Sequence, residues 1–157
     1  MSTLLSRRRT HDDLVGLARR YAATPERWPV PLRFEREHRW YHRIAADDDH
    51  EAWLLTWLPG QHTDLHDHGH ASGALLVLYG TVDEHVVAST GEPRVRSIPT
   101  GQARAFGPHH IHQVGNAGTA PAVSLHVYSP ALTTMTRYHL TGAGLVVLGV
   151  EHTGVDW

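Results

Sequence analysis

Two hydrophobic periodicities divide the chain. From Leu14 to Tyr21, apolar residues recur at the spacing of one helix face, and Thr10 with Asp13 forms a helix start signal just before them. Thr24-Pro25-Glu26 resembles a second helix cap with proline at the first helical position. The sequence therefore predicts a short helical part at the N-terminus.

From about residue 32 onward the pattern changes to short runs rich in Val, Leu, Trp, Tyr and Thr, separated by Gly, Pro and Asp turns. Regularly spaced short strands of this kind indicate an antiparallel β-sandwich or barrel. No internal repeat, low-complexity tract or linker interrupts them. We therefore predict one domain over residues 1–157, with helices in 1–31 and a β-barrel in 32–157.

Composition narrows the possible functions. The 157 residues are 41% hydrophobic and 19% charged, with a formal net charge of -2, so no global field attracts nucleic acid or an anionic membrane. The longest apolar run, Gly142–Val150, falls far short of the roughly 20 residues that span a bilayer. The absence of cysteine excludes disulfides, thiol nucleophiles and thiolate metal sites. We expect a cytoplasmic monomer without nucleic-acid or membrane partners.

The 15 histidines are the first chemical lead, since imidazole is a common metal ligand. His66 and His68 are two residues apart, so on a strand their side chains point to the same face and can hold one ion. His112 and His126 lie on later predicted strands, and a barrel could bring either one to that ion. Four further histidines are expected around the site or at the surface: His62, His70, His109 and His110.

The spacing of these residues resembles the cupin family. Gly60, His66-x-His68 and Gly80 match its first motif, and His112-x-x-x-Asn116 matches the end of its second. Gly73 stands where ordinary cupins have a glutamate ligand. The resemblance implies a ligand set of three neutral imidazoles, His112 joining the H-x-H pair. A facial triad with open positions suits Fe(II) and dioxygen chemistry, and three nitrogen ligands also suit a catalytic zinc.

A more specific resemblance rests on Ser124-Leu125-His126-Val127-Tyr128-Ser129-Pro130, taken with Trp57, His66-Asp67-His68, His112 and Tyr41-His42-Arg43. This combination is similar to the thiol dioxygenases, and within them to the cysteine dioxygenases. The resemblance implies an all-β cupin barrel, a non-haem Fe(II) cofactor, and L-cysteine and dioxygen as substrates. The implied product is cysteine sulfinic acid.

The resemblance also assigns roles. Ser124, His126 and Tyr128 alternate on one strand, so their side chains share a face and can form a hydrogen-bonded relay that ends at the Tyr128 phenol. That role favours His112 over His126 as the third metal ligand. Trp57 is expected in the apolar wall of the pocket.

Arg43 is the expected clamp for the substrate carboxylate, because a guanidinium can make two parallel hydrogen bonds to it. Tyr41 lies two residues away on the predicted strand Arg39 to Ala45 and would support the clamp. The peptide bond Ser129–Pro130 is expected to be cis. Gly73 also replaces the cysteine that mammalian members join to the relay tyrosine, so Tyr128 is expected to be uncrosslinked, as in bacterial-type members.

Three alternatives stay open. A dioxygenase of another small thiol acid, such as 3-mercaptopropionate, typically has glutamine at the position of Arg43. A non-enzymatic metal-binding cupin would not require the relay. A zinc hydrolase would require a carboxylate base, and Asp67 is predicted to lie on the opposite strand face from the metal.

Overall fold

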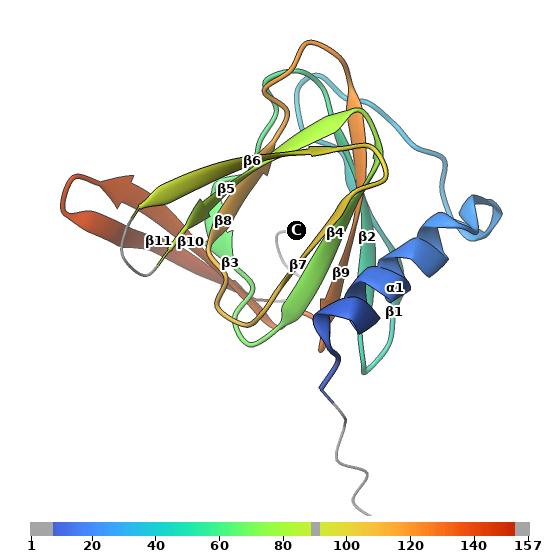
Figure 1. Ribbon diagram of the computed structural model, residues 1–157, viewed down its shortest axis with the longest axis horizontal. Helices are drawn as coiled ribbons and strands as arrows, with labels where there is room; N and C mark the ends of the chain where they lie inside the picture. The colour runs from blue at the N-terminus through green and yellow to red at the C-terminus, as the bar shows by residue number, and fades with distance from the viewer. Residues whose placement is uncertain (1–7, 89–91, 153–157) are drawn as a thin grey trace, which may run out of the picture.

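The computed structural model describes residues 8–88 and 92–152, which contain one α-helix, one 3-10 turn and eleven β-strands (Figure 1). The helical elements are α1 (His11–Ala22) and η1 (Pro25–Arg27). The strands are β1 (Tyr41–Ala46), β2 (Glu51–Trp57), β3 (Leu65–Asp67), β4 (Ser72–Tyr79), β5 (Thr81–Val87), β6 (Pro93–Pro99), β7 (Ala103–Phe106), β8 (His112–Gly115), β9 (Ala122–Ser129), β10 (Thr134–Thr141) and β11 (Gly144–His152).

The strands form two antiparallel sheets that face each other across a barrel. One sheet has the order β1-β2-β9-β4-β7, and the other has the order β11-β10-β3-β8-β5-β6. Helix α1 covers the outer face of the first sheet, and the β10–β11 hairpin projects from the end of the second (Figure 1). The predicted β-body with a helical N-terminus is therefore confirmed.

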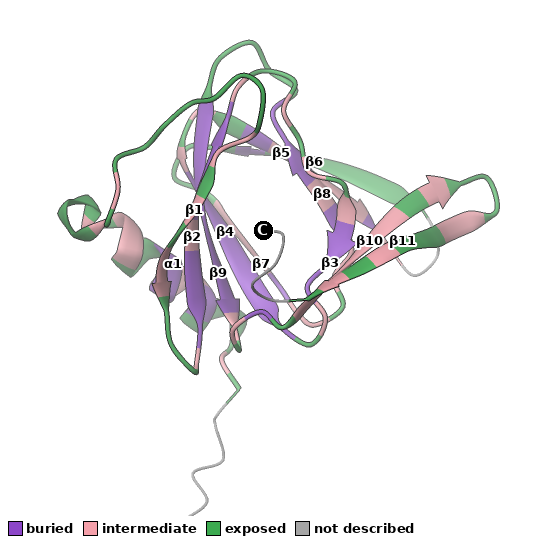
Figure 2. Cartoon of the chain, turned by 180° about the vertical axis from the view of Figure 1, so that it is seen from behind, coloured by how far each residue is buried: buried purple, intermediate pink, exposed green. Residues whose placement is uncertain are grey.

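Strands β2, β4 and β9 are buried along most of their length, as Figure 2 shows. Their outward side chains, including Leu54 and Leu125, pack against Leu14 and Leu17 of α1. Their inward side chains fill the barrel, where Trp57 belongs to the apolar cluster at one end. A strand covered on both faces has a nearly continuous hydrophobic sequence rather than an alternating one.

The side-chain cap that the sequence predicts forms at the first of the two N-terminal helical elements but not at the second. Thr10 caps α1 through a reciprocal capping box with Asp13, as the start signal predicted. The second helical element also lies where it was predicted, with Pro25 at its first position, but it is a short 3-10 helix and lacks the predicted side-chain cap. The Thr24 hydroxyl donates backward to the carbonyl of Arg20 instead of capping the turn. The strands also begin later than expected, at Tyr41 rather than near residue 32.

No helix among the described residues is long and apolar enough to cross a membrane.

Candidate functional site

Three buried histidines meet at the wall of the barrel. His66 on β3 lies directly opposite His112 on β8, and His68 follows β3. One ligand nitrogen from each lies within 4.8 Å of the others. The side chains are 6%, 2% and 1% exposed for His66, His68 and His112, respectively. The structure thus brings together the three residues expected to hold the metal, and His126 is not in this group.

The hydrogen bonds of these histidines decide which nitrogens are free. The Nδ1 of His66 lies 2.7 Å from the Asp64 carbonyl oxygen, and the Nδ1 of His112 lies 2.8 Å from the Glu84 carboxylate. Since both partners only accept, each Nδ1 carries a hydrogen and each Nε2 is left free. Both ring nitrogens of His68 are buried without any hydrogen-bond partner in the structure. A buried polar nitrogen without a partner is costly, and a metal ion at this point would satisfy it.

The protonation states also suit a metal. Burial lowers the pKa of His66 and of His68 well below the usual value, and the neighbouring imidazoles lower both further. Burial also lowers the pKa of His112, although Glu84 opposes this effect. Metal-binding imidazoles must be unprotonated at the ligand nitrogen. The group is therefore ready to bind a cation near neutral pH without first losing protons.

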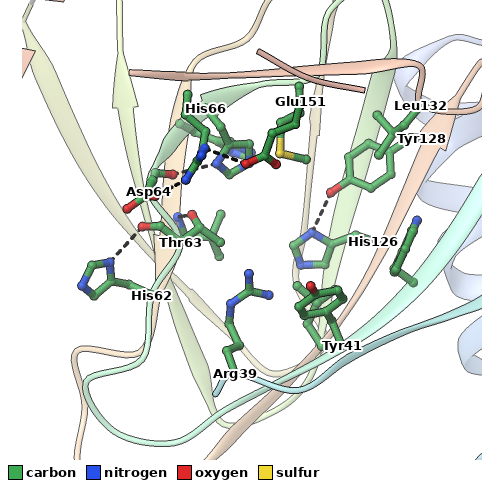
Figure 3. Close-up of a pocket in the computed structure, with 16 residues that line it drawn as sticks. Arg39, Tyr41, His62, Thr63, Asp64, His66, His126, Tyr128, Leu132 and Glu151 are labelled. Carbon is green, nitrogen blue, oxygen red and sulfur yellow. Dashed lines mark hydrogen bonds and ion pairs between the residues drawn. The ribbon is translucent and has the colours of Figure 1, made fainter. Parts of the chain in front are cut away.

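A chain of hydrogen bonds runs along the inner face of β9. The Nε1 of Trp57 donates to Ser124 Oγ at 2.9 Å, and Ser124 Oγ lies 2.8 Å from His126 Nε2. His126 Nδ1 lies 3.3 Å from the Tyr128 hydroxyl, and this contact is drawn in Figure 3. The three β9 residues thus form the contacts expected of a relay. Trp57, expected in the pocket wall, instead begins this chain and does not line the cavity.

Trp57 gives the chain a direction. An indole N–H can only donate, so Ser124 Oγ accepts from it, and the partner left for the Ser124 hydroxyl hydrogen among the described residues is His126 Nε2. Burial and the nearby His112 lower the pKa of His126 to about 3, so its imidazole is neutral at pH 7. A neutral ring that accepts at Nε2 donates at Nδ1. Tyr128 then accepts from His126 and keeps its own hydrogen for the cavity; burial raises its pKa above the usual value, so the phenol stays protonated.

A cavity of about 280 Å³ joins the histidine group to the relay. Its wall includes His66, His112, His126 and Tyr128. Figure 3 shows the Arg39 side chain entering this space between His126 and the segment that carries His62 and Thr63.

Arg39 is a partly buried cation in the wall of the cavity. Its guanidinium carbon lies 5.1 Å from the centre of the Tyr41 ring and 5.0 Å from that of Trp57. Within residues 8–88 and 92–152 no carboxylate forms an ion pair with it, whereas the other arginine at the cavity, Arg137, is paired with Glu151 at 2.8 Å. Arg39 is therefore the positive group that the cavity offers to an anionic ligand.

Arg43 lies elsewhere. It is exposed on β1, does not line the cavity, and its guanidinium carbon is 6.0 Å from the centre of the Trp53 ring. Tyr41 does line the cavity, but its ring contacts Arg39 rather than Arg43. The structure thus separates the two residues that the sequence placed together in a clamp.

Other residues singled out in the sequence surround the site. Asp67 is turned away from the three histidines, and its carboxylate accepts hydrogen bonds from the Gly69 amide and the Tyr138 hydroxyl. Gly73 lies opposite Tyr128 in the β4–β9 register. The Ser129–Pro130 peptide bond is cis, as expected. His62 lines the cavity.

Sequence reasoning missed two residues at the site. Arg39 precedes β1, which begins at Tyr41, so the period-two rule of a strand does not specify where its side chain points. Glu84 accepts from His112 and contacts His110 at 3.2 Å, and nothing in its local sequence connects it to either histidine. Burial by itself raises the pKa of Glu84, but the two imidazoles outweigh it and lower the pKa, so the carboxylate is charged.

Solved structures support the fold. The chain is similar to an uncharacterized conserved protein with a double-stranded beta-helix domain from Klebsiella pneumoniae, with a TM-score of 0.56, 17% identity, and coverage of 90% of this chain and 96% of that one. It is also similar to oxalate decarboxylase from Bacillus subtilis, with a TM-score of 0.58, 22% identity, and coverage of 66% of this chain and 29% of that one. The predicted cupin fold is confirmed.

Sequence relatives support the family. The chain is 28% identical to cysteine dioxygenase type 1 of Danio rerio over 134 residues, 76% of this chain and 65% of the relative. It is 23% identical to cysteine dioxygenase type 1 of Homo sapiens over 137 residues, 78% of this chain and 66% of the relative. It thus spans about two thirds of the length of these relatives. Residues 2–141 match the family model of cysteine dioxygenase type I, and the chain belongs to that family.

Proposed function

We propose that this protein is a thiol dioxygenase that uses a non-haem Fe(II) ion and dioxygen to convert L-cysteine to cysteine sulfinic acid. One observation carries the proposal: a single cavity joins the three-histidine group, the Tyr128 phenol and the Arg39 guanidinium. The reaction needs no further reductant, because the thiol RSH and O₂ together give RSO₂H. Both oxygen atoms go to the sulfur.

The donor set fits the ion. Fe(II) held by these imidazoles would supply the redox chemistry and the open ligand positions that dioxygen activation needs. The same set also suits zinc, but a zinc hydrolase needs a general base beside the metal. Asp67, the nearest acid in sequence, is held on the far side by Tyr138 and Gly69. The acids that line the cavity, Asp64 and Glu151, are both paired with Arg137, so the described residues offer no unpaired carboxylate there as a base, and this favours the redox reaction.

Arg39 would hold the substrate by its carboxylate. A carboxylate in a partly apolar cavity is costly without a fixed cation, and a guanidinium matches it with two parallel hydrogen bonds. No carboxylate among the described residues forms an ion pair with Arg39, although Asp64 lines the same cavity, and the Tyr41 and Trp57 rings lie against the guanidinium. Binding at Arg39 would orient the thiol end toward His66 and His112, which line the same cavity.

Tyr128 would act at the thiol end of the substrate, where the reaction takes place. Because the relay leaves the phenol hydrogen free, Tyr128 can donate a hydrogen bond or a proton into the cavity. Its oxygen is fixed by His126, whose ring is fixed in turn by Ser124 and Trp57. The chain has no cysteine, so the phenol acts without a thioether link.

The test is oxygen consumption by the anaerobically Fe(II)-loaded protein with L-cysteine, 3-mercaptopropionate and cysteamine, with the products identified by mass spectrometry. We expect cysteine sulfinic acid at one molecule per O₂ consumed. No oxygen consumption with any thiol by an iron-loaded protein would contradict the proposal and favour a non-enzymatic metal-binding cupin.

3-Mercaptopropionate is the second candidate substrate. It has the thiol and the carboxylate of cysteine but no amine. The location of Arg43 outside the cavity favours keeping this candidate, because Arg39 would bind the carboxylate of either thiol. A kcat/KM higher for 3-mercaptopropionate than for cysteine would identify 3-mercaptopropionate as the preferred substrate. The proposed reaction would still be the dioxygenation of a thiol.

A further inference from the structure

The buried carboxylate of Glu84 has no part in the function proposed above. Glu84 lies on β5, directly opposite Val114 of β8, and is 3% exposed. Its Oε2 atom lies 2.8 Å from His112 Nδ1 and 3.2 Å from His110 Nε2. A buried charge persists only where partners compensate it, and here two imidazoles do so. The carboxylate is therefore held against one member of the histidine group.

This contact makes His112 different from the other two histidines. His66 donates from Nδ1 to a neutral backbone carbonyl, and neither nitrogen of His68 has a hydrogen-bond partner in the part of the chain that the structure describes. A carboxylate behind an imidazole fixes its tautomer and ring orientation and makes the opposite nitrogen more basic. Only His112 in this group has such a partner among the described residues.

His110 and Phe106 hold the carboxylate in place. The His110 ring stacks on Phe106 with centroids 4.9 Å apart and planes 14° apart. Phe106 stacks in turn on His68, with centroids 5.2 Å apart and planes 24° apart. Glu84 is thus enclosed on one side by His112 and on the other by a ring packed through Phe106 onto the site.

We propose that Glu84 is a positioning residue for the metal centre, which orients His112, raises its basicity and supplies from behind it the negative charge that three neutral imidazoles lack. The inference rests on the proposed function only in that the three histidines bind a metal. Of the three imidazoles, that of His112 would then form the tightest bond to the metal. The metal affinity of the site would depend on Glu84, although Glu84 does not touch the ion.

The test is titration of the metal-free protein with Co(II), followed by visible absorption, in the wild type and in Glu84→Gln. The amide keeps the size and a hydrogen-bond acceptor but removes the charge. We expect one equivalent of Co(II) per chain in both, with Kd raised about 10- to 100-fold in Glu84→Gln. The matched control is Glu51→Gln, a carboxylate that is 2% exposed and accepts from Trp53 Nε1 at 2.9 Å. Its Kd should not change.

Two further variants keep the test decisive if Glu84→Gln folds poorly. Glu84→Asp keeps the charge and His110→Gln keeps the Glu84–His112 bond, so the Kd of each should stay closer to the wild-type value than the roughly 10-fold or greater increase expected when the charge is removed. Thermal unfolding of the metal-free variants separates a loss of metal affinity from a loss of fold.

Each remaining outcome has a distinct meaning. Unchanged Kd in Glu84→Gln would overturn the inference and leave the proposed function standing. Two equivalents in the wild type and one in Glu84→Gln would also overturn it, because Glu84, His110 and His112 would then bind a cation themselves. A wild-type protein that binds no Co(II) would overturn both the inference and the metal centre of the proposed function.

Discussion

His66 of β3 and His112 of β8 face each other directly across an antiparallel strand pair. Directly opposed side chains on one face have Cβ atoms roughly 4.5–5.5 Å apart, which lets both imidazoles reach the same ion. A slip of one residue would turn His112 to the other face of the sheet. The metal site therefore depends on strand register as much as on residue type.

Replacing any one of His66, His68 and His112 by alanine should remove most of the bound Fe(II), and activity should fall in parallel. The physical reason is that each supplies one of the three nitrogens that meet within 4.8 Å. Iron content and turnover are measured on each purified variant. His126→Ala is the comparison and should keep its iron, since His126 bonds to Ser124 and Tyr128 instead. Full iron in His112→Ala, with loss in His126→Ala, would mean that these two residues have exchanged roles.

Tyr128→Phe should keep iron and substrate binding but slow or uncouple oxygenation. The phenol is the end of the hydrogen-bond chain from Trp57, and a positioned proton donor typically contributes about 10²- to 10⁴-fold to a rate. The measurement is sulfinate formed per O₂ consumed, together with kcat. Unchanged rate and coupling would leave Tyr128 as a packing residue.

Acidification should destabilise the metal-free protein. The pKa of His126 falls to about 3 in the folded state, while the unfolded chain has the ordinary value of about 6.5. Between these two values the unfolded state binds a proton that the folded state does not, so the free energy of unfolding decreases as pH falls. The maximum contribution is about 1.4 kcal/mol per pH unit for each such group. The depressed pKa values of His66 and His68 act in the same direction.

The measurement is urea unfolding of the metal-free protein at several pH values from 7 down to 4. His126→Gln removes one titrating group, so its stability should depend less steeply on pH than that of the wild type. An identical slope in both proteins would show that the pKa of His126 is not lowered in the folded state.

The β9 segment shows what the sequence could predict. Period-two spacing placed Ser124, His126 and Tyr128 on one face, and the structure joins them because a strand alternates its side chains whatever its neighbours are. The same rule paired His66 with His68. These predictions depend only on the local backbone, which the hydrophobic pattern specifies.

Arg39 and Glu84 show what the sequence could not predict. Whether an arginine near the start of β1 points into the cavity depends on how the segment before the strand crosses the barrel mouth, and no local pattern specifies that path. Glu84 meets His112 only because β5 pairs with β8, a contact between distant parts of the chain. The cap predicted at Thr24 is absent for a local reason, since the Thr24 hydroxyl donates backward to the Arg20 carbonyl and leaves η1 uncapped.

Gly73→Ala should destabilise the protein. A Cβ at this position would lie 2.6 Å from the Phe106 ring and 2.8 Å from the Val127 carbonyl oxygen, so the packed barrel would have to shift. Such overpacking typically costs about 1–3 kcal/mol. Thermal unfolding measures the loss, and Gly107→Ala is the control, because a Cβ there would meet nothing within 4 Å. Equal stability of the two variants would show that Phe106 moves aside freely.

Substrate affinity should depend on Arg39 more than on Arg43. Arg39 lines the cavity without an acidic partner among the described residues, whereas Arg43 is exposed beside Trp53. Truncating one partner of a buried charge pair costs about 2–5 kcal/mol, so Arg39→Ala should lower kcat/KM for cysteine by about 30-fold or more at 1.4 kcal/mol per decade. Arg43→Ala should lower it much less. Iron content should be normal in both variants.

Turnover of cysteamine distinguishes two roles of Arg39: binding the substrate carboxylate, and supporting the cavity as a whole. It has the thiol and amine of cysteine but no carboxylate, so Arg39→Ala should reduce its turnover far less than that of cysteine. Equal losses for both substrates would mean that Arg39 supports the cavity wall through Tyr41 and Trp57 rather than binding substrate. A large, cysteine-specific loss in Arg43→Ala alone would mean that Arg43 turns inward when substrate binds, and the clamp would then be the residue that the sequence first indicated.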